Sequence, residues 1–356
     1  AAMAFVEMLE AGYGSVVEFH YLHHAPGGQR YAERAELSAR IVQAAERTGI
    51  GLTLLPVLYQ RGGADGRPLA GAQLRFGNDV DGFAELIAGA RRLLAHAPAD
   101  FRLGVAPHSL RAVDAVGIEA ALALAPQGPI HIHLAEQPAE VEEICRHLGA
   151  PPVRWLLDHA PVDGRWCAIH CTHMSDGESE RLAASGAVVG LCPVTEADLG
   201  DGIFAATYFL AVGGRIAVGT DSNVRISLVD ELRWLEYGQR LRDHCRAALA
   251  DSCRSSGRRL FDLACAGGAQ AAARPSGAIA PGLFADLVAI DTDNPWLCGR
   301  RGDAVLDSFI FAAPDRMLVR EVWSAGRHVV RGGRHLQREL VEAAFRRALR
   351  ELGLGS

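Results

Sequence analysis

The sequence predicts an α/β fold of the (β/α)8 TIM-barrel type, and three observations support this class. Short, continuously apolar runs recur along the first 273 residues, as in strands that are covered on both faces. Amphipathic helical patterns separate these runs, so strands and helices alternate as in βα units with a parallel sheet. Histidines and an aspartate end several runs, where such barrels carry their active sites. No Gly-x-Gly-x-x-Gly follows a strand, which favours a barrel over a doubly wound sheet.

The barrel strands are expected in the order in which the apolar runs occur. The runs are 15–20, 51–59, 101–108, 129–134, 166–171, 187–192 and 215–221. Helices are expected between them at 31–48, 82–96, 117–124, 138–148, 176–185 and 228–241. The chain opens with a helical pattern, 4–11, that ends at Gly12. A helix ahead of the first visible strand leads us to expect that the first of the eight barrel strands is missing from this sequence.

The pattern changes after about residue 273. Residues 275–281 are punctuated by proline and glycine, and short runs follow at 285–291, 308–311, 319–324 and 328–330. Such runs with turn residues between them are typical of a small β unit, and 336–352 is an amphipathic helical pattern. We therefore expect a barrel that lacks its first strand at 1–273, the C-terminal part of a composite β-sandwich at 274–335, and a C-terminal helix at 336–356.

Composition excludes several classes of function. All 36 basic residues are arginine, so these residues provide no Schiff-base lysine, P-loop lysine or carbamylated-lysine metal bridge. The formal net charge of −6 argues against nucleic acid or an anionic membrane as partner. No apolar run reaches the ~18 residues of a membrane span, and no basic signal-peptide region opens the chain. The 8 cysteines form no Cys-x-x-Cys pair, so we expect reduced thiols in a cytoplasmic protein.

The segment 131–136, His-Ile-His-Leu-Ala-Glu, carries the first candidate site residues. His133 ends a strand and could offer a ring nitrogen to a metal, with packing in the interior as the alternative. Glu136 follows three residues later and could face the same cavity as a proton carrier. His131 shares the face of His133 but lies deeper, so we expect it to be buried and hydrogen-bonded.

Two further strand ends carry candidate catalytic residues. His170 ends the run 166–171, where a catalytic role and core packing both remain open. Asp221 ends the run 215–221, directly after Val-Gly-Thr. A carboxylate there is costly unless it is paired or binds a metal, although Asp-Ser-Asn before a helix is also typical of a cap.

Candidate substrate contacts follow the first and third runs. Arg111 stands three residues after His108 and could bind a carboxylate with both of its terminal nitrogens; a surface ion pair is the alternative. His20 and Tyr21 leave the first strand, and either could reach the pocket. The neighbouring pair at 23–24 does not face one way, so we do not expect those histidines to share a metal.

Together these motifs resemble the amidohydrolase superfamily. The resemblance is carried by His-Leu-Ala-Glu at 133–136, His-Cys-Thr-His at 170–173, Gly-Thr-Asp-Ser at 219–222 and the segment 279–288. Within the superfamily, segments 17–24 and 104–113 look like those of formimidoylglutamate deiminases. The resemblance implies zinc-dependent hydrolysis of N-formimino-L-glutamate to N-formyl-L-glutamate and ammonia, a step of histidine degradation.

The resemblance also implies roles for particular residues. One zinc ion would be held by His133 and Asp221 together with a His-x-His motif on the first strand, and that motif lies outside this sequence. Glu136 and His170 would act on the imino group, and Asp221 would accept the proton of the attacking water. The residues implied at the substrate carboxylates are Tyr21, His108 and Arg111. We expect a homodimer that acts on a small dicarboxylate.

Two alternatives remain open at this stage. A deaminase or chlorohydrolase of an aromatic heterocycle would share the barrel and the zinc, but a neutral ring would give Arg111 no carboxylate to bind. A truncated, non-catalytic barrel would bind metal poorly, because two ligands hold zinc more weakly than four.

Overall fold

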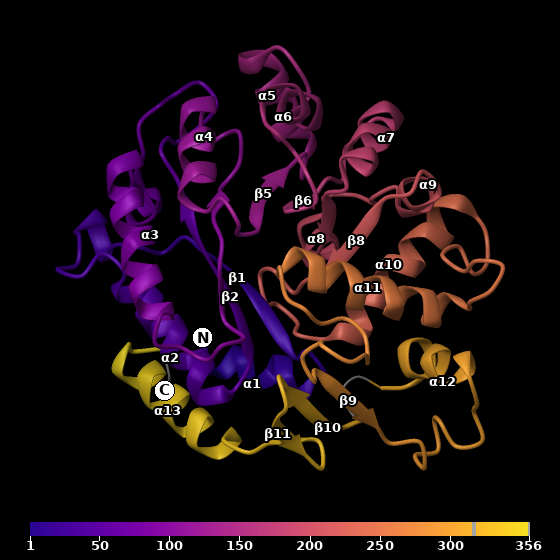
Figure 1. The fold of residues 1–356 in the computed structure, drawn as a ribbon. Helices are drawn as coiled ribbons and strands as arrows, with labels where there is room; N and C mark the ends of the chain where they lie inside the picture. Colours follow the sequence, from indigo (N-terminus) through magenta and orange to yellow (C-terminus); the bar gives the residue numbers. More distant parts are fainter. Residues whose placement is uncertain (315–317, 355–356) are drawn as a thin grey trace.

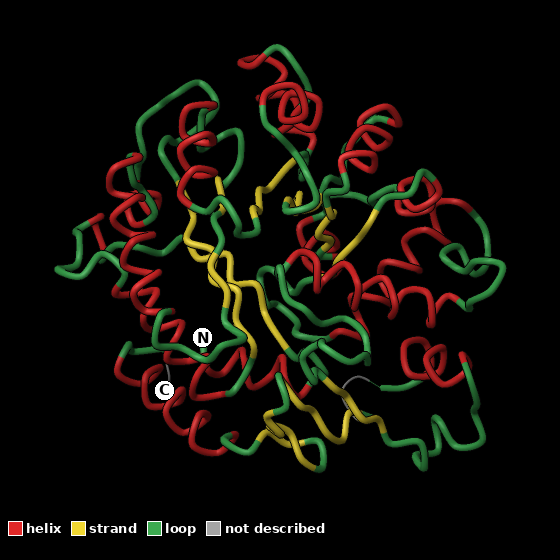
Figure 2. Tube along the Cα trace, in the orientation of Figure 1, coloured by secondary structure: helices red, strands yellow, loops and turns green. Residues whose placement is uncertain are grey.

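The structure is a computed structural model that describes residues 1–314 and 318–354. The last two residues of the expected helical segment 336–356, and three residues within 274–335, lie outside the described residues. Two parallel half-sheets form a barrel wall, helices cover its outside, and an antiparallel sheet lies at one end (Figure 1). Figure 2 shows the same arrangement, with strands inside and helices around them. Within the described residues, no helix combines the length and apolar character needed to cross a membrane.

The barrel wall consists of two four-stranded parallel sheets. The first contains β1 (Ser15–His20), β2 (Gly51–Leu58), β3 (Arg102–Leu103) and β4 (Ala106–Pro107), and the second contains β5 (Ile130–Leu134), β6 (Trp166–His170), β7 (Val188–Leu191) and β8 (Arg215–Val218). Isolated bridges from Val105 to Ile130 and from Ser109 to His133 join the two sheets. Among the described residues, no ladder pairs β8 with β1, so the wall is open between these two strands.

The predicted run at 101–108 is not one strand but two short ones, β3 and β4. Both pair with β2, first through Thr53 and Leu54 and then through Val57 and Leu58. The break falls at Gly104, where a Cβ atom would lie 2.3 Å from the carbonyl oxygen of Pro129. Only glycine allows the backbone to pass this close to the start of β5.

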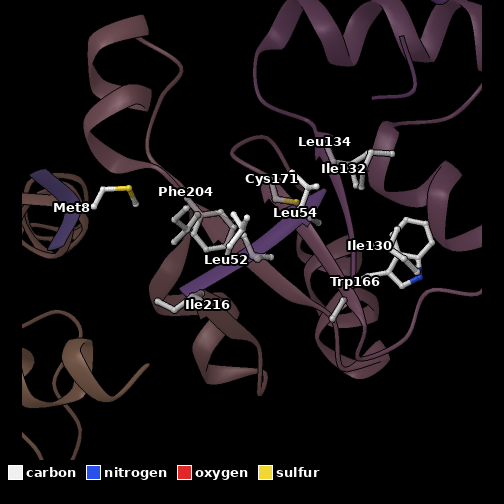
Figure 3. Close-up of a cluster of buried hydrophobic side chains, with 14 of the residues drawn as sticks. Met8, Leu52, Leu54, Ile130, Ile132, Leu134, Trp166, Cys171, Phe204 and Ile216 are labelled. Atoms are coloured by element: carbon white, nitrogen blue, oxygen red, sulfur yellow. The ribbon is translucent and has the colours of Figure 1, made fainter. Parts of the chain in front are cut away.

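Helices cover the outside of the wall in the alternating order that the sequence predicts. They are α1 (Ala2–Glu10), α2 (Glu36–Thr48), α3 (Val80–Leu94), α4 (Ala115–Leu124), α5 (Pro138–Leu148), α6 (Pro152–His159), α7 (Asp176–Ser185), α8 (Pro193–Leu199), α9 (Ala206–Ala211), α10 (Leu228–Asp243) and α11 (Ser256–Ala271). Capping fixes several of their starts; Ser175 and Glu178, for example, form a capping box on α7. One large apolar core lies between helices and strands, and Figure 3 shows side chains from β2, β5 and β6 within it.

The C-terminal region forms an antiparallel sheet that packs near the start of the chain. Its strands are β9 (Leu287–Ile290), β10 (Val319–Ser324), β11 (Arg327–Arg331) and β12 (Arg334–His335), in the order β12-β11-β10-β9. The closing helix α13 (Arg338–Glu351) contacts α1, and Arg338 pairs with Glu10 at 2.9 Å.

The predicted strand at 308–311 is wrong. Helix α12 (Asp303–Asp307) continues there into a π-helical turn, η3 (Ser308–Ala312). Val305 and Leu306 precede Phe309 and Ile310 by four residues, so the apolar positions follow helical periodicity. The four residues 308–311 are too few to show this period, so the sequence pattern predicted a short strand there.

Candidate active site

The strand-end histidines that the sequence predicts lie side by side at the carboxyl end of the barrel. His108 follows β4, His133 lies in β5 and His170 ends β6. The ring centroids of His108 and His133 are 4.8 Å apart, and those of His133 and His170 are 5.6 Å apart in a stacked arrangement. Parallel strands end at the same edge of a barrel, which is why residues far apart in sequence meet here.

His133 is oriented so that one ring nitrogen remains available. Its Nδ1–H donates to the backbone oxygen of His108 at 3.0 Å, which leaves Nε2 with its lone pair. Burial, with the neighbouring His108 and His170, places the pKa of His133 well below its usual value. The imidazole is therefore neutral, as a metal ligand must be.

His170 lies between two carboxylates. It is 1% exposed, its Nδ1 is 3.1 Å from Oε1 of Glu196, and its Nε2 is 3.7 Å from Oε1 of Glu136. Burial disfavours the charged imidazole, but the hydrogen bond and charge of Glu196, with the charge of Glu136, outweigh it and raise the pKa of His170. This ring therefore holds a proton more readily than an ordinary histidine, which suits a role in proton transfer.

Glu136 follows β5, and its Oε1 lies 3.7 Å from Nε2 of His170. It follows Ala135, which has a left-handed backbone at φ +50°, and its own N–H donates to Oε2 of Glu140 at 2.9 Å. Burial and the charge of Asp201 raise the pKa of Glu136 against the opposing charges of His170 and Arg111. A carboxyl group with a raised pKa is suited to carrying protons in catalysis.

Asp221 follows β8 and is exposed, so its carboxylate does not carry the cost of burial considered from the sequence. Its negative charge contributes to the raised pKa of both Tyr21 and His170, although burial is the larger cause for Tyr21. Asp221 itself adopts φ +41°, and His170 adopts φ +70°. Non-glycine residues hold such backbone angles only where the surrounding structure imposes them, and active sites are where they gather.

A positively charged, aromatic side of the site faces these groups. Nη2 of Arg111 is 3.8 Å from Oε2 of Glu136, and within the described residues its buried Nε has no hydrogen-bond partner. Burial and the charge of Arg111 lower the pKa of His108 to about 3, so that ring is neutral. The ring of Tyr21 is 6.0 Å from that of His108, and the ring of Tyr59 is 4.5 Å from it.

Other predicted histidines lie outside this cluster. Nε2 of His131 bonds the backbone oxygen of Ala271 at 2.8 Å, the buried role expected for it. Nε2 of His23 bonds the carbonyl of Val57 and Nε2 of His24 that of Gly77. The two neighbouring rings thus bind different carbonyl groups, as expected for side chains that do not face one way.

The sequence reasoning missed Tyr59 and Glu196. Tyr59 follows β2, and Glu196 is buried on α8. An aromatic residue after a strand was a usable signal for Tyr59. Nothing in the local sequence distinguishes Glu196 from a solvent-exposed helix residue.

The donors at the site suit a metal in chemistry and orientation. Zinc takes histidine nitrogen and carboxylate oxygen, and a metal-bound histidine usually donates its other N–H to a carbonyl or carboxylate, as His133 does to His108. His133 thus has the chemistry and orientation of one ligand, and the carboxylate of Asp221 has the chemistry of a second, in a site that takes at least three from protein. Among the described residues, the closest donor trio is instead His170, Cys192 and Glu196.

Known proteins resemble this chain in both sequence and fold. The sequence model of the Amidohydrolase family matches residues 1–329. The formimidoylglutamate deiminase of Pseudomonas aeruginosa is 49% identical over 354 residues, which cover 99% of this chain and 78% of that protein. The crystal structure of an amidohydrolase from Brucella melitensis superposes with a TM-score of 0.94 at 49% identity, over 99% of this chain and 78% of its own. An adenosine deaminase from Xanthomonas campestris with bound zinc shares the fold, with a TM-score of 0.80 at 23% identity over 98% and 73%.

Fold and site together define a barrel enzyme whose strand ends carry histidines and carboxylates. The chain belongs to the amidohydrolase family. This confirms the resemblance drawn from the motifs, the narrower resemblance to formimidoylglutamate deiminases, and the predicted TIM-type α/β class. The same matches support a hydrolase that acts on a carbon–nitrogen bond.

Proposed function

We propose that this protein is a zinc-dependent formimidoylglutamate deiminase, which hydrolyses N-formimino-L-glutamate to N-formyl-L-glutamate and ammonia in histidine degradation. The observation that carries the proposal is the placement of Arg111 beside the histidine and carboxylate cluster. Its buried Nε has no partner among the described residues, although its Nη2 reaches Glu136. The 49% identity to the Pseudomonas aeruginosa deiminase supports the same substrate.

Arg111 supplies the charge that a dicarboxylate needs. A guanidinium binds a carboxylate through two parallel N–H donors, and the unpartnered Nε of Arg111 leaves it a donor for this purpose. His108 and Tyr21 lie next to each other on the same side and would complete the contacts to the substrate carboxylates. A dianion then binds locally positive charge in a protein whose net charge is −6.

Glu136, His170 and Asp221 would handle the protons. Glu136, with its raised pKa, would deliver a proton to the departing nitrogen. Nε2 of His170 would contact the reacting centre and help to polarise or stabilise it, and Asp221 would accept a proton from the attacking water. A zinc ion held by His133, Asp221 and further ligands would supply a Lewis acid that acidifies water.

The direct test is ammonia release from N-formimino-L-glutamate in the presence of zinc. It is run on this chain and on the full-length protein encoded by its gene, with N-formyl-L-glutamate measured in parallel and bound metal by elemental analysis. We expect equal amounts of the two products and zinc in stoichiometric amount. No turnover by the zinc-loaded full-length protein would refute the proposal, and the absence of bound metal would favour a non-catalytic barrel.

A neutral aromatic heterocycle is a poorer substrate for this site. The triazine hydrolase and adenosine deaminase structures that share the fold are at most 23% identical, so they carry no argument about substrate. A neutral ring would give Arg111 no carboxylate to bind, and the buried Nε of Arg111 would stay without a hydrogen-bond partner, which is costly. If the enzyme turned over a heterocycle but not N-formimino-L-glutamate, the heterocycle would become the preferred substrate class.

A further inference from the structure

Glu196 is a buried carboxylate that touches the candidate site from behind. It lies on α8, directly after β7, and is 5% exposed. Its Oε1 accepts two hydrogen bonds, one from the backbone N–H of Cys192 at 2.9 Å and one from Nδ1 of His170 at 3.1 Å. The same oxygen therefore ties the start of α8 to the imidazole that ends β6.

The segment that carries Glu196 is held in place independently of His170. Pro193 begins α8 with a fixed φ angle, and the N–H of Val194 donates to Oε2 of the buried Glu231 at 3.0 Å. The hydroxyl groups of Thr195 and Ser222 are 2.9 Å apart, which links the turn to the loop after β8. Glu196 thus presents its carboxylate from a fixed position.

The hydrogen bond to Glu196 determines what His170 can offer the substrate. A carboxylate accepts hydrogen bonds, so Nδ1 of His170 must carry the proton, and the ring is turned with Nε2 toward Glu136 at 3.7 Å. In other enzymes a buried carboxylate that fixes the tautomer and orientation of a catalytic imidazole contributes strongly to the rate. Without this hydrogen bond, the ring could rotate or take the other tautomer.

We propose that Glu196 is a positioning residue that fixes the tautomer and orientation of His170, so that Nε2 faces the reacting carbon–nitrogen group. The inference builds on the proposed function, because its kinetic test uses that substrate. Glu196 itself need not touch the substrate.

An alternative interpretation is that Glu196 binds a metal ion. His170, Cys192 and Glu196 place one ligand atom each within 4.8 Å of one another. The two hydrogen bonds of Glu196 account for this proximity without an ion. Cys192 is 5% exposed, and burial, with the negative charges of Glu196 and Asp221, raises the pKa of its thiol well above the usual value. A thiol that resists deprotonation is a poor metal ligand. Metal analysis of the variants below separates the two readings.

The kinetic test compares Glu196→Ala and Glu196→Gln with a matched control, Glu178→Gln. Glu178 is also a buried carboxylate that accepts backbone N–H groups, from Arg154 and Ser175, and within the described part of the chain it forms no hydrogen bond to a site residue. We expect Glu196→Ala to lower kcat about 10²-fold with KM changed less than about threefold, in the range for second-sphere partners. Glu196→Gln keeps an accepting oxygen, so it should retain kcat within about tenfold of the wild type.

The control and the metal content decide how these numbers are interpreted. Glu178→Gln should keep the wild-type kcat even where it lowers the melting temperature. A wild-type kcat in Glu196→Ala, or equal losses of kcat in Glu196→Ala and Glu178→Gln, would overturn the proposal. A fall in zinc content in both Glu196 variants would make Glu196 a ligand and would also overturn it.

A second readout does not depend on activity. Long-range proton–nitrogen NMR of protein labelled with ¹⁵N-histidine reports which ring nitrogen of His170 is protonated, with His170→Asn used to assign its signal. We expect Nδ1 to be protonated in the wild type and in Glu196→Gln, and a mixture of tautomers in Glu196→Ala. An unchanged Nδ1-protonated spectrum in Glu196→Ala would refute the positioning role. If the wild type fails to deaminate N-formimino-L-glutamate, the proposed function fails while this spectrum still tests Glu196.

Discussion

The two ends of the barrel use charged residues in opposite ways. At the amino end of the strands, Arg274 is almost fully buried and pairs with Asp100 at 3.0 Å and with Asp286 at 2.8 Å. Arg327 of β11 adds a 2.7 Å ion pair to Asp100 and a hydrogen bond to the carbonyl of Gly49. The network joins the barrel to the antiparallel sheet below it (Figure 1). Each of these buried charges has its counter-charge, so removing one partner would leave an uncompensated charge and destabilise the fold.

At the carboxyl end, ionisable side chains are held with part of their hydrogen-bonding capacity unused. Nε of Arg111 and Oε1 of Glu231 are buried without hydrogen-bond partners among the described residues. The difference indicates that the amino end stabilises the fold, whereas the carboxyl end is arranged to bind something else.

Among the substitutions that test this comparison of the two barrel ends, Glu136→Gln is expected to have the largest effect, a loss of kcat without a loss of stability. Glutamine keeps the shape but cannot carry a proton, so kcat for the proposed deaminase reaction should fall about 10³-fold, within the usual range for loss of a general acid or base. Because burial already raises the pKa of Glu136, a neutral side chain should leave the melting temperature equal to or above that of the wild type. Steady-state kinetics and thermal unfolding measure the two quantities. Retention of activity within tenfold would remove Glu136 from the proposed catalytic group.

The reciprocal change at the amino end is Arg274→Met. Removing one partner of a buried ion-pair network costs roughly 3–5 kcal/mol, and here it leaves Asp286 without its guanidinium partner. We expect urea unfolding to show a loss of about 3 kcal/mol, while kcat per folded molecule stays unchanged. Arg301→Met, at an exposed position, is the control and should change the free energy of unfolding by less than about 0.5 kcal/mol. A loss of kcat without a loss of stability in Arg274→Met would contradict the division between the two ends.

The sequence predicted the carboxyl end better than the amino end, and the reason is geometric. Strand ends in a parallel barrel meet at one edge, so His108, His133 and His170 could be grouped from local patterns alone. The ion pair of Arg274 with Asp100 spans 174 positions along the chain, and no local pattern indicates such a partner. Glu196 escaped prediction for the same reason, since its function depends on a contact with a histidine on a different strand.

A smaller effect, specific to the substrate, is expected for Arg111→Met. Loss of a charge-assisted contact to a carboxylate costs about 1.5–3 kcal/mol, so kcat/KM for N-formimino-L-glutamate should fall about 10²-fold. Formamidine, which has the reacting group but no carboxylate, should be hydrolysed equally by the wild type and the variant, and it serves as the control. Equal losses for both compounds would mean that Arg111 acts on the reacting group rather than on the carboxylate.

The smallest effect, a change in the pH dependence of stability, is expected for Glu231→Gln. Glu231 on α10 is fully buried, and Glu196, Asp230 and Asp221 are the charged groups that act on it. Burial, with the negative charges of these three carboxylates, raises the pKa of Glu231 to about 9. The unfolded chain releases this proton near pH 4.5, so the folded state binds more protons between about pH 4.5 and 9. Stability from this group is therefore present at low pH and is lost as the pH rises.

Glutamine at position 231 cannot ionise and can still accept the N–H of Val194, so it removes this pH dependence. We expect Glu231→Gln to match the wild type at pH 5 and to exceed it at pH 8 by at least about 1 kcal/mol, since one pKa unit corresponds to about 1.4 kcal/mol. Urea unfolding at both pH values measures the difference. Glu236→Gln provides the contrast five residues along α10, because the Glu236 carboxylate pairs with Arg240 at 2.6 Å and its neutralisation should destabilise the fold at both pH values. If Glu231→Gln gains the same stability at pH 5 and at pH 8, the gain comes from packing and not from the proton held by Glu231. Proton binding would then not distinguish Glu231 from the paired charges around Arg274.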